Sequence, residues 1–79
     1  MNPDALEFSF VRSEMRTLLG CLLREELRLQ EIVSVSEDEI EITDAVNGLA
    51  EVRLLLDRLR KPAVEKYGPG VARFDFDLR

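Results

Sequence analysis

The sequence predicts an α+β fold in which two helices pack on one side of an antiparallel sheet. Two long segments carry apolar residues at the three- and four-residue spacing of amphipathic helices. Shorter segments around them alternate apolar and polar residues, as half-buried strands do. In chain order these elements read β-α-β-β-α-β, which is the order of the ferredoxin-like arrangement. The 79 residues are expected to form a single domain, 1–79.

The first predicted helix covers residues 13–31, with Ser13 as its N-cap. The centre of its apolar face consists of Met15, Leu18, Leu22 and Leu29. Thr17, Gly20 and Cys21 lie off that face. The opposite side of this helix is therefore expected to carry unusually small side chains.

The second predicted helix covers residues 44–60 and ends close to Pro62. One apolar stripe should face the core, namely Ala45, Leu49, Val52, Leu55, Leu56 and Leu59. A second, narrower set lies outside this stripe at four-residue spacing and comprises Val46, Ala50 and Leu54. Because a helix that is apolar on two sides is buried on both or covered by a partner, these three residues are predicted to form a protein-contact surface.

Between the helices, residues 32–35 and 40–42 are rich in β-branched side chains and flank a polar stretch, 36–39. This pattern favours a β-hairpin. In the alternative, Ser36 and Glu39 form a capping box that opens a longer helix. The hairpin is preferred because Ile40 and Ile42 alternate with acidic residues.

The two ends of the chain complete the predicted sheet. Residues 71–78 alternate after a Gly-Pro-Gly turn, and one face of this strand consists of Ala72, Phe74, Phe76 and Leu78. Residues 6–10 show the same alternation. However, Asn2-Pro3-Asp4 can also open a helix. The alternative fold is therefore a long N-terminal helix followed by the hairpin, the second helix and the C-terminal strand.

Charge is concentrated in the middle of the chain. Residues 29–52 contain seven acidic residues and no Lys or Arg, within a net charge of -5 for the whole chain. Glu37, Asp38, Glu39 and Glu41 form a candidate acidic contact patch for a basic protein. The same negative field disfavours binding to nucleic acid or to an anionic membrane. The acidic residues lack the glycine and glutamate spacing of an EF-hand, so no metal site is expected.

The residue inventory argues against an enzyme. The chain has no histidine, the commonest general base and metal ligand, and its single cysteine, Cys21, has only arginines nearby to activate it. We therefore expect no catalytic residue and no cofactor. The longest apolar run is three residues, 54–56, and no secretory signal is visible, so a cytoplasmic location is expected.

Two functions remain as hypotheses. The first is a small adaptor or regulatory protein that acts through protein contacts and forms a homodimer, using Val46, Ala50 and Leu54. The second is an acidic inhibitor, of the antitoxin, immunity-protein or nucleic-acid-mimic type, that neutralises a basic partner protein through its acidic patch.

Overall fold

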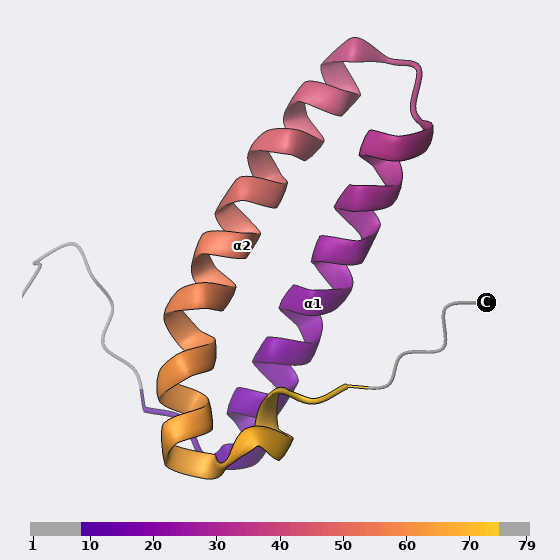
Figure 1. Ribbon diagram of the computed structural model, residues 1–79. Helices are drawn as coiled ribbons and strands as arrows, with labels where there is room; N and C mark the ends of the chain where they lie inside the picture. Colours follow the sequence, from indigo (N-terminus) through magenta and orange to yellow (C-terminus); the bar gives the residue numbers. More distant parts are fainter. Residues whose placement is uncertain (1–8, 75–79) are drawn as a thin grey trace, which may run out of the picture.

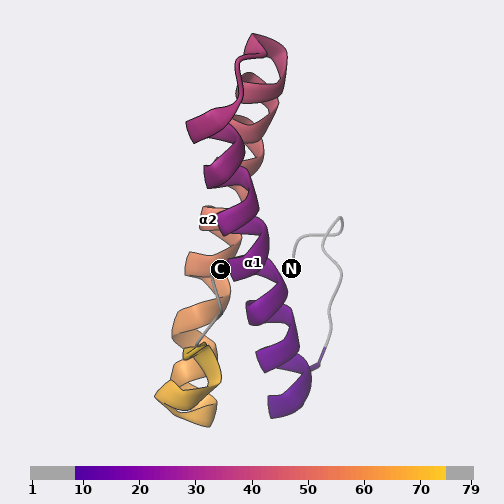
Figure 2. The same ribbon diagram turned by 90° about the vertical axis from the view of Figure 1, so that its right-hand side faces the viewer.

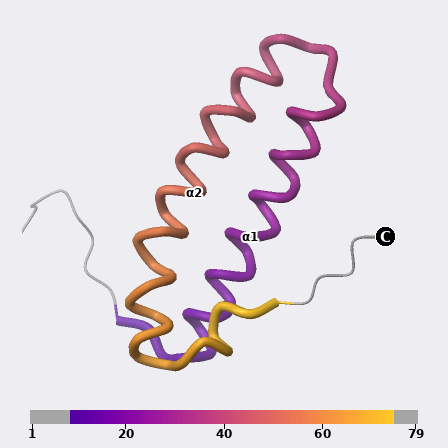
Figure 3. The backbone as a smooth tube through the Cα atoms, viewed as in Figure 1, coloured from indigo at the N-terminus to yellow at the C-terminus, as the bar shows by residue number. Residues whose placement is uncertain are grey.

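The computed structural model describes residues 9–74, which form a helical hairpin followed by a short 3-10 helix. Helices α1 (Arg12–Val35) and α2 (Glu39–Tyr67) run side by side in opposite directions, and η1 (Pro69–Ala72) packs at the open end of the hairpin (Figure 1). The tube in Figure 3 shows the same path without the ribbons. No strand occurs in residues 9–74, so the predicted α+β, ferredoxin-like fold is wrong.

Helix α1 begins one residue before the predicted cap and continues four residues beyond the predicted end. Its N-cap is Val11, whose backbone N–H donates to the Glu14 carboxylate at 3.0 Å. At the other end, the predicted strand 32–35 is the last turn of the helix. The β-branched Ile32 and Val33 pack against the apolar cluster around Leu29. Burial of these side chains therefore outweighs the weak strand preference of this segment.

The predicted β-hairpin at residues 32–42 is also wrong, and a helix start takes its place. The Asp38 carboxylate accepts hydrogen bonds from the backbone N–H groups of Ile40 at 2.9 Å and Glu41 at 3.4 Å. Asp38 is therefore the N-cap of α2, while the Ser36 hydroxyl accepts from the Asp38 N–H at 3.2 Å. Carboxylates are favourable in the first turn of a helix, which explains why the acidic residues here promote a helix start. The alternative prediction, a longer helix that opens at Ser36, gave the right element, but the N-cap is Asp38, two residues later.

Helix α2 continues five residues past Pro62, where the sequence predicted its end. A proline inside a helix removes one backbone hydrogen bond and costs about 3 kcal/mol. The residues that follow it offset this cost by packing. Ala63 is buried, and the Tyr67 hydroxyl donates to the Phe10 carbonyl at 2.7 Å.

Helix α2 ends at Gly68, whose φ of 89° lies in the left-handed region that glycine tolerates best. The chain then reverses into η1, which inserts the fully buried Val71 between the helices. The predicted strand 71–78 is therefore wrong for residues 71–74, while residues 75–78 lie outside the described range. Of the predicted strand 6–10, only Ser9 and Phe10 are described, and both are outside any strand or helix.

The core is a single seam between the two helices, divided into two clusters. The larger cluster, at the open end, consists of Met15, Leu19, Leu56, Ala63 and Val71. The smaller one, toward the turn, consists of Leu29, Ala45 and Leu49. Figure 2 shows that the helices cross at an angle, with η1 and the residues leading into α1 on opposite sides of the pair. Leu55 was predicted to face the core, and this prediction is wrong, since 40% of the residue is exposed.

Candidate protein-contact surface

Val46, Ala50 and Leu54, which we call the α2 ridge, all lie exposed on the outer side of α2. Val46 is 48% exposed and Leu54 is 62% exposed, in contrast to 3% for Ala45 and Leu56 on the core side. Ala50 is exposed as well. Since the members are four residues apart, they follow one another along a single row of the helix surface. The structure thus brings together the three residues that the sequence selected.

The rotation of α2 that turns this row outward also brings two other residues of the helix against α1. The Arg53 guanidinium donates to the Glu26 carboxylate of α1 at 3.0 Å. On the neighbouring side of the seam, Gly48 lies against the Leu29 side chain, and a Cβ built on Gly48 would stand 3.4 Å from Leu29 Cδ1. With these two points held against α1, the α2 ridge is turned away from the core.

The predicted acidic patch lies at the turn between the helices and in the first turn of α2. Glu37, Asp38, Glu39 and Glu41 are all exposed. Asp38 already serves the fold as the N-cap of α2. Within residues 9–74, no group of three acidic or thiol side chains is arranged to hold a metal ion.

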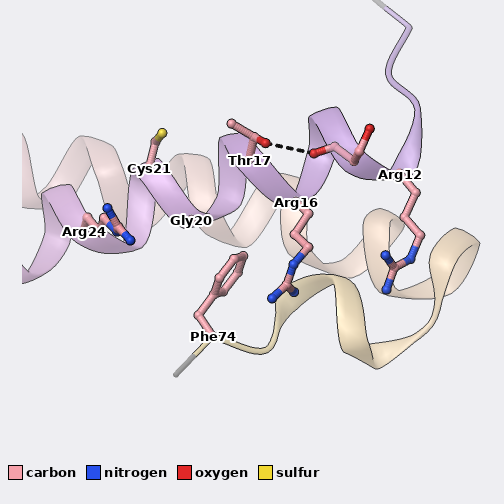
Figure 4. Close-up of a pocket in the computed structure, with 8 residues that line it drawn as sticks. Arg12, Arg16, Thr17, Gly20, Cys21, Arg24 and Phe74 are labelled. Carbon is pink, nitrogen blue, oxygen red and sulfur yellow. Dashed lines mark hydrogen bonds between the residues drawn. The ribbon is translucent and has the colours of Figure 1, made fainter. Parts of the chain in front are cut away.

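Sequence reasoning missed a third feature, a hollow on α1 of about 500 Å³. The side chain of Phe74 lies across Gly20, which is buried beneath it (Figure 4). The hollow is lined by Arg12, Ser13, Arg16, Thr17, Gly20, Cys21, Arg24 and Phe74. The small side of this helix was predicted, but nothing in the local pattern indicated that the C-terminal segment would cover it.

Arg16 holds this C-terminal segment in place. Its Nη1 donates to the carbonyl oxygens of Gly70 at 2.7 Å and of Arg73 at 2.9 Å. Its guanidinium carbon also lies 4.5 Å from the centre of the Phe74 ring, a cation–π distance. These contacts give Arg16 a structural role between α1 and the chain after η1.

Cys21 lies exposed at the edge of the hollow. We expect Cys21→Ser to leave the fold and self-association unchanged, because the thiol is not needed for packing. Circular dichroism and sedimentation of the variant beside the parent protein check this. A loss of self-association with the helical content retained would show that the thiol contributes to contact.

A second ion pair on the surface joins two residues of α1. The Arg28 guanidinium donates to the Glu25 carboxylate at 2.6 and 2.9 Å. This hydrogen bond, together with the positive charge of Arg28, lowers the pKa of Glu25 below its ordinary value. Both side chains are exposed, so the pair contributes little to stability.

No protein-family model, curated protein or solved structure matches this chain. Neither α1 nor α2 contains an apolar stretch that could span a lipid bilayer, as judged over the described residues.

Proposed function

We propose that this protein is a small, non-catalytic adaptor or regulatory protein that acts through protein contacts and self-associates through the α2 ridge. The observation that carries the proposal is the exposed row of Val46, Ala50 and Leu54 on a helix that already buries its other side. An apolar row of this kind gains free energy when a second surface covers it.

The shape of the molecule supports self-association. Domains are generally built from at least two packed layers around a core, whereas α1 and α2 form one layer with a narrow seam between them (Figure 1). Small domains bury a low fraction of their surface and are correspondingly marginal. A second copy on α2 would add apolar burial that the hairpin lacks.

Leu54→Glu tests the proposal. A charge placed in an apolar contact must lose its water without gaining a partner, so this substitution should abolish self-association in sedimentation experiments. The monomer should stay folded by circular dichroism, because Leu54 is 62% exposed. The matched control is Leu55→Glu, which makes the same change one residue away and off the ridge.

The two variants separate the alternatives. If Leu54→Glu unfolds the protein, Leu54 belongs to the core. If the parent protein is monomeric at every concentration up to the millimolar range, or if both variants self-associate like the parent, the α2 ridge is not a self-contact surface.

The exposed acidic turn supports a second candidate function, inhibition of a basic partner protein. All four carboxylates of the patch lie at one end of the hairpin, away from the arginines that line the hollow on α1. Binding of this kind is steered by long-range charge and weakens as salt is raised. Affinity for a basic partner that falls steeply with salt and survives Leu54→Glu would favour this candidate.

A further inference from the structure

We infer that the partner on the α2 ridge is a second copy in antiparallel orientation, with a twofold axis close to Ala50. This inference rests on the proposed function and adds the direction and register of the pairing. It follows from the way charge and side-chain size are distributed along α2.

Charge on α2 is divided between its two halves. Residues 39–51 contain four acidic residues and no basic one, while residues 52–67 contain five basic and two acidic residues. Two parallel helices in register would place like charges beside each other along their whole length. Antiparallel helices place each acidic half beside the basic half of the partner, and their dipoles also oppose one another favourably.

The α2 ridge is suited to a twofold axis at its centre. Its middle residue is the smallest, Ala50, with the larger Val46 and Leu54 four residues to either side. In an antiparallel pair centred on Ala50, each Val46 packs beside the partner's Leu54, and the two alanines let the backbones approach. At each of the two equivalent contacts, the longer leucine side chain therefore packs beside the shorter valine side chain.

One pair of oppositely charged residues beside the ridge matches in the same register. Asp44 and Arg58 lie six residues before and eight residues after Ala50, on the same side of α2. Both are exposed, and within residues 9–74 neither forms a salt bridge. The antiparallel pair brings Asp44 of each copy close to Arg58 of the other, twice by symmetry. Arg53, by contrast, is already bound to Glu26 of its own chain.

Disulfide trapping measures the register directly. In a Cys21→Ala background, three variants each carry one cysteine, Val46→Cys, Ala50→Cys or Leu54→Cys, and are oxidised alone or as mixtures. A disulfide requires Cα atoms within about 7 Å. In the antiparallel pair, Val46 of one copy lies about 12 Å along the axis from Val46 of the other, at a rise of 1.5 Å per residue.

We expect Ala50→Cys to form a disulfide with a second copy of itself. Val46→Cys and Leu54→Cys should form a disulfide with each other in the mixture, and neither should form one when it is oxidised alone. Cross-linking of Val46→Cys with itself, alongside Ala50→Cys, would overturn the antiparallel register while leaving the α2 ridge as the interface. A monomeric parent protein with no cross-link at position 50 would overturn the proposed self-association itself.

Charge reversal provides a second readout without cysteine. Asp44→Arg or Arg58→Asp alone should weaken the dimer about three- to tenfold, since each breaks two exposed ion pairs. The double variant should recover the parent dissociation constant. Glu41→Arg is the matched control, because it makes the same charge change in the acidic half, on the side of α2 that faces away from the ridge. Equal weakening by Glu41→Arg, or no recovery in the double variant, would contradict the pairing of Asp44 with Arg58.

Discussion

Leu19→Ala should lower the free energy of unfolding by about 3 kcal/mol, within the range for truncating a buried leucine. Leu19 is fully buried and belongs to the larger cluster, where α1, α2 and η1 meet. Removing it leaves a cavity that three elements would have to close at once. Since small proteins are stable by only about 5–15 kcal/mol, this is a large fraction of the total.

Urea unfolding followed by circular dichroism gives this value, with all variants compared at one low protein concentration so that self-association contributes equally. The control is Ile40→Ala, which removes a side chain that is 75% exposed and should change stability by about 0.5 kcal/mol or less. A similar loss for both substitutions would contradict the position of the core.

The sequence predicted both helices because their apolar periodicity is long enough to be decisive. Met15, Leu29, Ala45, Leu49 and Leu56 were predicted to face the core and are buried. The same periodicity separated the α2 ridge from the core stripe, so the exposed positions of Val46 and Leu54 follow from the sequence alone. Whether a partner covers them does not follow from periodicity, because an exposed row and a covered row have the same spacing.

The predicted strands at residues 32–35 and 40–42 were wrong because each rested on a very short segment, the first rich in β-branched residues and the second alternating. Three residues at 40–42 fit a strand by alternation, but a helix start is favoured by Asp38 and the acidic first turn. At residues 32–35 the β-branched side chains suggested a strand, yet Ile32 and Val33 pack, as part of α1, on the cluster that includes Ala45 and Leu49 of α2. In both places a contact distant in sequence, or a cap, decided between two local preferences of similar size.

The hollow on α1 could not be predicted for a related reason. Gly20 on a helix indicates a close approach, but only the folded chain shows that the approaching group is Phe74, fifty-four residues later. The aromatic spacing at 74 and 76 was instead interpreted as one face of a strand. Aromatic residues at this spacing fit either a strand or a segment that packs on a helix, and a helical glycine indicates a close approach without showing which group approaches.

Because Phe74 packs on Gly20, we expect the effect of Gly20→Ala on stability to change sign when the Phe74 ring is removed. Phe74→Ala alone should lower the free energy of unfolding by about 2 kcal/mol, less than a fully buried phenylalanine because its ring is half-buried. Gly20→Ala in the parent protein should be neutral or destabilising, because the new Cβ would stand 3.0 Å from Phe74 Cε1. In the Phe74→Ala background the obstruction is gone, and Gly20→Ala should stabilise by about 1 kcal/mol through helix propensity.

The difference between the two backgrounds is a coupling energy, which urea unfolding of the four proteins measures. Gly48→Ala is the matched control, since Gly48 lies against Leu29 in the other cluster and its effect should be the same with or without the Phe74 ring. If Gly20→Ala stabilises equally in both backgrounds, the ring does not lie over Gly20 in solution. If instead the coupling appears at Gly20 and not at Gly48, the chain after η1 is held on α1 by this contact, together with the Arg16 hydrogen bonds to Gly70 and Arg73.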